Sequence, residues 1–476
     1  MKRRSVLQAS LVGVVSSLIP RSWAVNDRPA LKMPVLLDAT QTGRIDLTIQ
    51  AGQVDFLGRG MKSPTKGFNG AFLGPVLRLP RRDTQVSITN QTQQPTTVHW
   101  HGMLIPGAVD GGPHEMITTG SSWHPVLPVH QPAATVWYHA HPHGRTARDV
   151  YSGLAGVIHI VDGRDDERGL PHSYGEDDFT LVLQDRYFDQ SGTMVYDTSM
   201  PTRMHGLHGN AILVNGQYGT QLPVPKGWVR LRLLNGSNAR IYPLSFADGR
   251  EMHLVATDGG YLKAPVSLQQ LWLSPGERYE ILVDFSNGQA AVMRSEDDPN
   301  AMGGGSGFAV LPFVVDASKK ARMKKMPSDL GSTEAKWAVP GKTNRVLTLD
   351  MGMGPGMMMR GMSGGAGGFA ISGESFDMHR INQQIKLGTV ERWRVESSMM
   401  MHPFHVHGVQ FKVLSMSGGT PPTQYQGWHD TVLVNGSVEF AMRFDEQASK
   451  EKPYMYHCHI LEHEDAGMMG QFSVLA

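Results

Sequence analysis

Short runs of aliphatic and β-branched residues, each closed by Gly, Asn or Asp, recur along most of the chain. They are residues 84–90, 155–162, 179–185, 228–235, 278–285, 345–350, 391–397, 430–436 and 470–476. No long segment with the 3.6-residue period of a helix competes with them. The pattern predicts an all-β protein built from Greek-key β-sandwiches.

Two polar stretches divide this pattern, one at residues 163–175 and a lysine-rich one at 316–341. A chain of 476 residues is long enough for several domains. We therefore expect three: domain 1 over 25–163, domain 2 with its linker over 164–341, and domain 3 over 342–476. Domain 2 carries none of the motifs described below, and its expected role is to space the other two.

The N-terminus has the features of an export signal. Lys2-Arg3-Arg4 precedes an apolar stretch at 6–19 and a small-residue site at 22–24, which predicts a signal peptide over 1–24 rather than a membrane span. Arg3-Arg4 and the residues after it resemble a twin-arginine signal, with an ordinary secretory signal as the alternative. The rest of the chain is nearly neutral, which argues against a nucleic-acid partner.

Histidines cluster in His-x-His pairs. With 21 histidines in 476 residues, chance placement gives about one such pair. The chain has His99/His101, His139/His141, His141/His143, His405/His407 and His457/His459. We interpret them as metal ligands.

The two ends of the chain repeat each other. Residues 98–102 (V-H-W-H-G) match 404–408 (F-H-V-H-G), and 138–141 (Y-H-A-H) match 456–459 (Y-H-C-H). This indicates a duplicated domain. Because Ala140 stands where Cys458 stands in the second copy, only the C-terminal copy can provide a thiolate ligand.

Cys458 is the one cysteine of the chain, and His463 and Met468 follow it closely. A thiolate, imidazoles and a weak thioether are the ligands of a blue copper centre. In a strand, successive side chains face opposite ways, so His457 and His459 would face away from the metal that Cys458 binds. One tripeptide would then contact two metal centres.

These motifs resemble those of three-domain bacterial multicopper oxidases, closest to the periplasmic copper-efflux (cuprous) oxidases and the bacterial laccases. The resemblance implies cupredoxin-like domains, a periplasmic location and four copper ions. It implies a type 1 copper held by His402, Cys458 and His463 with Met468 axial, and a type 2 copper held by His99 and His405. The type 3 pair would take His101, His139, His141, His407, His457 and His459.

The implied reaction is one-electron oxidation of a reductant coupled to four-electron reduction of O2 to water. By the same resemblance Asp110 and Glu464 would relay protons, although each is also interpretable as a structural carboxylate that fixes a loop or a histidine tautomer. His143 is expected to support the ligands from behind.

Methionines suggest the reductant. Residues 351–362 hold six Met, and Met399, Met400 and Met401 precede His402; thioethers prefer Cu(I). By resemblance Met351 and Met400 match a cuprous substrate site, with Asp350 as the one nearby acid. Ser398 stands where such oxidases carry an Asp, so phenol oxidation of the laccase type is the alternative.

Two alternatives lie outside enzymology: a copper-sequestering protein, and a metal-free scaffold of the cell envelope. The complete ligand set argues against the scaffold. We expect a monomer.

Overall fold

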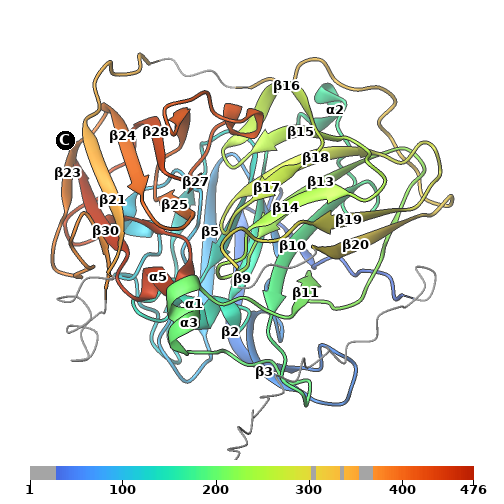
Figure 1. Ribbon diagram of the computed structural model, residues 1–476, viewed down its shortest axis with the longest axis horizontal. Coiled ribbons are helices and arrows are strands. Elements are labelled where there is room, and N and C mark those ends of the chain that lie inside the picture. The colour runs from blue at the N-terminus through green and yellow to red at the C-terminus, as the bar shows by residue number, and fades with distance from the viewer. Residues whose placement is uncertain (1–27, 302–306, 333–336, 353–367) are drawn as a thin grey trace, which may run out of the picture.

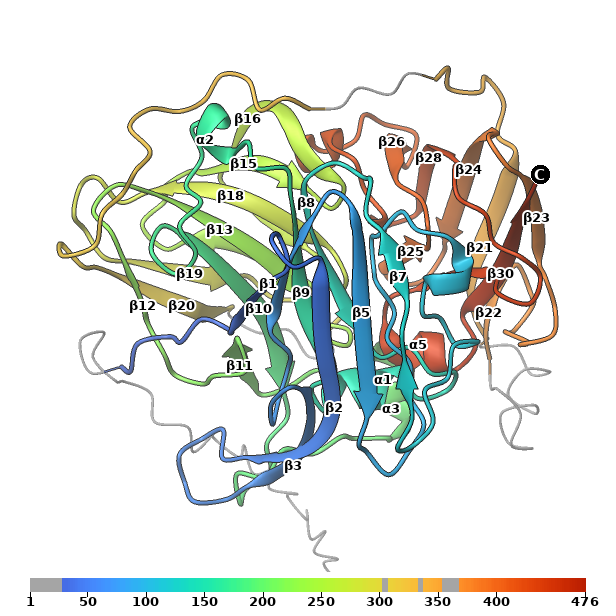
Figure 2. The same cartoon turned by 180° about the vertical axis from the view of Figure 1, so that it is seen from behind.

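The computed structural model describes residues 28–301, 307–332, 337–352 and 368–476. Within them the chain forms six β-sheets, which follow one another along the chain as three pairs. Figure 1 shows the second pair beside the third, and Figure 2, from behind, shows the first pair in front of both. The all-β class with cupredoxin-like sandwiches is confirmed.

The first pair comes from the N-terminal part of the chain. One sheet has the order β1 (Leu36–Asp38), β4 (Val76–Pro80), β9 (Ala155–Val161), β8 (Ala134–His139). The other has the order β3 (Ser63–Phe68), β2 (Arg44–Val54), β5 (Asp83–Asn90), β6 (Ser122–Trp123), with β7 (Val126–Pro128) also on β5. Along β2, Ile45, Leu47 and Ile49 are buried while Arg44 and Asp46 are exposed, the two-residue period of a half-buried strand.

The second pair follows. Its larger sheet has the order β11 (Ala211–Val214), β10 (Asp178–Arg186), β13 (Trp228–Asn235), β18 (Arg278–Asp284), β15 (Met252–Thr257), β16 (Gly260–Leu268). Its smaller sheet has the order β12 (Leu222–Val224), β20 (Phe308–Val315), β19 (Ala291–Ser295), β14 (Tyr242–Phe246), β17 (Leu271–Leu273). Every residue of β10 is buried, because both faces of the larger sheet are covered there.

The third pair holds most of the candidate ligands. One sheet has the order β22 (Phe369–Ile371), β21 (Arg345–Met351), β24 (Val390–Ser397), β28 (Ser437–Arg443), β26 (Phe411–Met416). The other has the order β23 (Gln383–Lys386), β30 (Met469–Leu475), β29 (Tyr454–Cys458), β25 (His402–Val406), β27 (Thr431–Val434).

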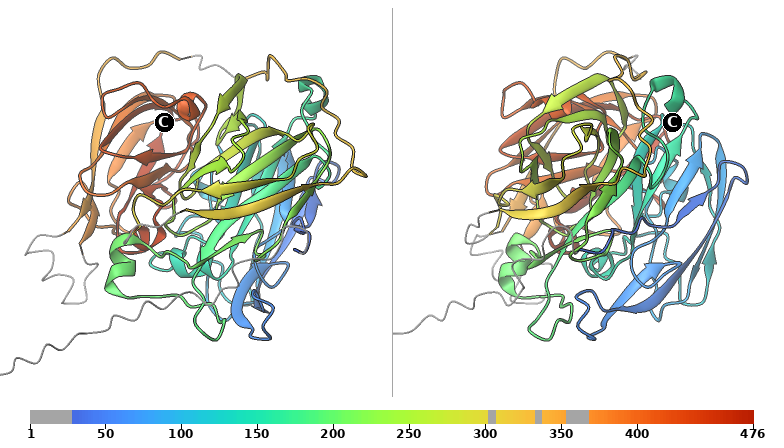
Figure 3. Two further views of the ribbon diagram at one scale, coloured as in Figure 1. Left: turned by 45° about the vertical axis from the view of Figure 1, so that its right-hand side comes forward. Right: turned by 90° about the vertical axis from the view of Figure 1, so that its right-hand side faces the viewer.

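Helices are short and few in the described residues. They are α1 (Thr146–Tyr151), α2 (Asp165–Arg168), α3 (Met200–His205), α5 (Leu461–Asp465) and the 3-10 turns Gly107–Val109 and Thr423–Gln426. Helix α5 packs against both α1 and α3, so the three sheet pairs meet around it (Figures 1 and 3). No helix in the described ranges has the length and apolar character needed to cross a membrane.

Each strand expected from the sequence overlaps an observed strand, from β5 to β30. The proposed domain boundaries stay predictions. The signal peptide at 1–24 and all but the first two residues of the methionine segment lie outside the described residues.

Candidate metal centres

Two neighbouring strands place the thiolate and the histidines. Strands β25 and β29 pair antiparallel, with Phe404 opposite Cys458 and His405 opposite His457. In the first copy, His99 and His139 form the corresponding bridge. Because side chains alternate along a strand, Cys458 faces the interior of the third sandwich and its histidine neighbours face the first.

The first centre surrounds the thiol of Cys458. Its Sγ lies 3.3 Å from His402 Nδ1 and 3.8 Å from His463 Nδ1. All three side chains are fully buried, and Met468 lies in the same hydrophobic core. Burial raises the pKa of the Cys458 thiol and lowers the pKa of His402 to about 4. Without metal the site is therefore neutral, and a metal ion that binds here displaces the thiol proton.

The second centre is a cluster of histidines in which the two copies interleave. The ring of His99 stacks on His407 with centroids 3.8 Å apart, and His101 stacks on His405 at 3.6 Å. Each stack joins one imidazole from the first sheet pair to one from the third. Neither copy alone forms the cluster.

Many of the cluster nitrogens point inward without a protein partner. His141 Nε2 and His407 Nε2 each lie 3.3 Å from His457 Nε2. Among the described residues, buried nitrogens with no hydrogen-bond partner include His99 Nε2, His101 Nδ1, His139 Nε2, His405 Nε2 and both ring nitrogens of His459. Unpaired buried polar atoms are rare in folded proteins, and imidazole is a good ligand for copper. The histidine clusters fit copper sites.

Two buried carboxylates support the cluster from behind. Asp110 Oδ2 accepts a hydrogen bond from His407 Nδ1 at 2.8 Å and lies 3.3 Å from His99 Nδ1. Glu464 lies on the other side, 3.2 Å from His457 Nδ1 and 3.5 Å from His141 Nδ1. Burial, and next to it the charge of Asp465, raises the pKa of Glu464 well above its usual range.

A third carboxylate, that of Asp430, also contacts the cluster, and no sequence motif indicates it. Its Oδ1 lies 3.1 Å from His101 Nε2, and its peptide oxygen accepts a hydrogen bond from His405 Nδ1 at 2.8 Å. Arg278 of β18 forms a two-point ion pair with it. The expectation that domain 2 only spaces the others is therefore incomplete. No local motif marks this contact, because its partners are about 150 residues apart in sequence.

The outer edge of the thiolate centre is covered. His463 Nε2 donates a hydrogen bond to the peptide oxygen of Met204 in α3 at 3.2 Å. Phe369 stacks on the His463 ring with centroids 4.6 Å apart. His463 is consequently fully buried.

Of the candidate substrate residues, Met351 and Met400 are partly buried against the core that contains Cys458 and Met468. Asp350 does not join them. Its carboxylate accepts hydrogen bonds from Gly373 N at 2.7 Å and Thr348 Oγ1 at 3.2 Å, since alternation along β21 turns it to the face opposite Met351. The expectation that Asp350 lies with these methionines is therefore wrong.

The expectation for His143 is also corrected. Its side chain is exposed and packs edge-on against Phe376 with centroids 5.0 Å apart. The turn that begins at Pro142 carries it away from the cluster.

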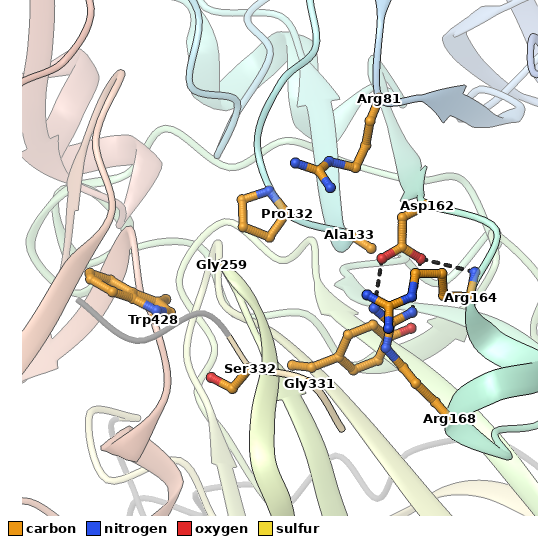
Figure 4. Close-up of a pocket in the computed structure, with 11 residues that line it drawn as sticks. Arg81, Pro132, Ala133, Asp162, Arg164, Arg168, Gly259, Gly331, Ser332 and Trp428 are labelled. Carbon is orange, nitrogen blue, oxygen red and sulfur yellow. Dashed lines mark hydrogen bonds and ion pairs between the residues drawn. The ribbon is translucent and has the colours of Figure 1, made fainter. Parts of the chain in front are cut away.

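A separate pocket lies where the three sheet pairs approach one another (Figure 4). The ion pair of Arg168 with Asp162 forms one wall, and Arg81 and Trp428 line other sides. None of its lining residues is a candidate metal ligand.

Comparisons with known proteins agree with this geometry. Family profiles described as multicopper oxidase match residues 48–165, 177–311 and 340–476. The chain is 36% identical over 477 residues to the cell division protein FtsP of Dickeya dadantii, which covers 99% of this chain and 98% of the relative.

Solved structures are similar as well. The laccase-like multi-copper oxidase CueO from Ochrobactrum sp. is 40% identical with a TM-score of 0.87, covering 93% of this chain and 100% of that one. A laccase from Pediococcus acidilactici is 32% identical with a TM-score of 0.83, covering 94% of each chain. Three matched segments span most of the chain, and its buried histidines cluster as a copper site requires. The chain therefore belongs to the multicopper oxidase family.

Proposed function

We propose that this protein is an oxidase that couples one-electron oxidation of Cu(I) to four-electron reduction of O2 to water, in the service of copper tolerance. One observation carries the proposal: Cys458 and its neighbour His457 belong to two different buried donor sets, and His459 lies at the second one with both ring nitrogens unpaired. A storage protein would not need a thiolate site joined by three consecutive residues to a histidine cluster.

The donor sets suit four copper ions. His402, Cys458 and His463, with Met468, would hold a type 1 copper. His99 and His405 would hold a type 2 copper, and the type 3 pair would take His101, His139, His141, His407, His457 and His459. When bound, copper would supply one-electron acceptance at the first site and reduction of O2 at the cluster.

Asp110 and Glu464 are the groups proposed to move protons. Asp110 Oδ1 is buried without a hydrogen-bond partner among the described residues, while Oδ2 is fixed by His407. Glu464 spans two histidines and favours its protonated form because it is buried. Both carboxyl groups contact imidazoles of the cluster, which places them where a proton relay would act.

Cu(I) is the preferred reductant because of how the type 1 site is covered. The Nε2 edge of His463 is closed by Met204 and its face by Phe369, so a bulky ring has no direct contact with it. The thioethers of Met204, Met351 and Met400 pack against the same core and suit a soft, small ion.

Oxygen consumption by the copper-loaded protein tests this substrate. Cu(I) and a substituted phenol are supplied separately, each with and without added Cu(II). Efficient Cu(I) turnover, with phenol oxidation only when extra copper is present, supports a cuprous oxidase. Brisk phenol turnover without added copper and poor Cu(I) turnover would make it a laccase, as the oxidase activity of the Ochrobactrum relative towards lignin model compounds suggests.

A role in cell division is the second candidate, since full-length relatives carry that name. A deletion strain complemented with Cys458→Ser separates the two. If growth in copper fails while division is normal, the oxidase is the function; if division needs the protein and the variant restores it fully, copper chemistry is dispensable for that role.

We further propose export by the twin-arginine pathway to the periplasm and a monomeric state. Fractionation of cells that carry Arg3→Lys with Arg4→Lys tests the first, and light scattering tests the second.

A further inference from the structure

The strand that begins at Arg278 brings a guanidinium to the edge of the histidine cluster. Arg278 is fully buried. Nη1 donates to Asp430 Oδ1 at 2.7 Å and Nη2 to Asp430 Oδ2 at 2.6 Å. The other three N–H groups donate to the peptide oxygens of Thr135, Gly276 and Asp258. With all five donors engaged, the guanidinium has one orientation.

Asp430, held by Arg278, in turn fixes two imidazole rings of the cluster through hydrogen bonds. Its Oδ1 accepts from His101 Nε2 at 3.1 Å, and its peptide oxygen accepts from His405 Nδ1 at 2.8 Å. Thr431 Oγ1 lies 3.1 Å from the same His101 nitrogen. The proton of His101 is thereby held on Nε2, and the unprotonated Nδ1 faces the cluster with its lone pair free to bind a metal ion.

Asp110 and Asp430 play matching parts in the two copies. The peptide oxygen of Asp110 accepts from His99 Nδ1, and its carboxylate crosses to His407 in the other copy. Asp430 does the same with His405 and His101. The carboxylate of Asp110 keeps a buried oxygen without a partner, whereas both oxygens of Asp430 are bound by Arg278. Of these two matched carboxylates, Arg278 therefore fixes only Asp430.

The ion pair between Arg278 and Asp430 explains why a glycine, Gly102, follows His101. A Cβ on Gly102 would lie 2.4 Å from Arg278 Nη2 and 2.6 Å from Asp430 Oδ2. In the second copy the matching Gly408 makes room for the ring of Tyr454 instead. The same sequence motif therefore serves two different neighbours, and in the first copy it leaves space for the ion pair.

We propose that Arg278 is a positioning residue of the cluster: it fixes Asp430, and through Asp430 it sets the ring orientation and tautomer of His101 and His405. The proposal rests on the copper cluster of the proposed function but not on its substrate. Loss of such a supporting contact weakens metal binding by about 10- to 100-fold in proteins.

The test compares Arg278→Lys and Arg278→Met with Arg232→Lys as the matched control. Arg232 is also buried, makes a two-point pair with Asp178, and lies on the neighbouring strand β13 without contacting a cluster histidine. The readouts are copper retained against a chelator, the paramagnetic resonance spectrum of the type 2 copper, and the blue absorption of the type 1 copper.

We expect both Arg278 variants to lose cluster copper at about 10- to 100-fold lower chelator concentration and to change the type 2 spectrum, with the blue absorption intact. Arg232→Lys should leave the spectrum and retention as in the wild type. Should Arg278→Met fail to fold, Arg278→Lys decides the question. Wild-type spectrum and retention in Arg278→Lys, or equal changes in the Arg232 control, would overturn the positioning role. A wild-type protein that binds only the type 1 copper would overturn the proposed function as well.

Discussion

At the scale of residues, Cys458 and its two histidine neighbours serve different centres because a strand turns successive side chains to opposite faces. The thiolate lies with His402 and His463, and His457 lies with His141 and His407. The two centres are therefore chemically separable although they share one tripeptide.

Replacing Cys458 with Ser should abolish the blue absorption and turnover while the cluster keeps its copper, since no cluster contact involves Sγ. Absorption spectroscopy and metal analysis measure the two effects. Ala140→Ser, at the matching position of the first copy and equally buried, is the control that should change neither. Loss of all copper from the Cys458 variant would contradict two separable sites.

The stability of the folded protein should depend on pH through the carboxyl group of Glu277. Burial, and next to it Asp258, raises its pKa to about 8. The folded protein then keeps a proton that the unfolded chain releases, so this contribution to stability is complete below about pH 4.5 and declines as pH rises towards 8, by up to about 1.4 kcal/mol per pH unit.

Glu277→Gln should remove that decline. Denaturant unfolding of both proteins at about pH 5, 6.5 and 8 gives the difference in free energy of unfolding at each pH. We expect the free energy of unfolding of the variant, relative to that of the wild type, to increase as pH rises. Parallel profiles would show that Glu277 is ionised in the folded state.

That the histidines of the two copies come together is predictable from sequence, because His-x-His spacing on a strand is a local pattern that the duplication repeats. Asp430, Arg278 and Met204 are not, since each acts through a contact between distant segments. Asp350 is adjacent to Met351 in sequence, but alternation along the strand turns its carboxylate to the opposite face.

At the scale of elements, α3 covers one edge of the centre around Cys458. It is six residues long and has no buried residue, yet the peptide oxygen of Met204 closes the edge of His463. So short a helix leaves no periodic signal in the sequence, whereas the long alternating strands did.

Exchanging residues 200–205 for a Gly/Ser linker should uncover His463 and raise kcat/KM for a bulky phenol by about tenfold, equivalent to about 1.4 kcal/mol of barrier. Cu(I) oxidation should fall or stay unchanged. Steady-state oxygen uptake measures both. The same exchange in the exposed turn 189–191 should alter neither, and unchanged phenol kinetics in the α3 variant would mean that another segment covers the site.

At the scale of the whole molecule, burial of so many imidazoles makes the metal-free protein sensitive to acid. Burial is the largest cause that holds the pKa of His139, His141 and His463 well below 6.5, and it lowers that of His402 to about 4. The unfolded chain takes up these protons first, so stability is full above about pH 6.5 and falls as pH drops towards 4.

We expect the free energy of unfolding of the metal-free protein to fall steeply between about pH 6.5 and 4, by up to about 1.4 kcal/mol per pH unit for each such histidine. Calorimetry or denaturant unfolding measures the slope. Equal stability at both ends of this range would mean that the imidazoles are solvated rather than packed together.

The stacking of His99 on His407 and of His101 on His405 has a consequence for synthesis. A growing chain that has folded its first sandwich holds only half of a cluster, and the thiolate and the last imidazoles emerge only with residues 457–463. A ribosome stalled anywhere before that point displays no complete copper site. A cluster able to bind copper can therefore form only in chains whose synthesis has passed the final candidate ligands.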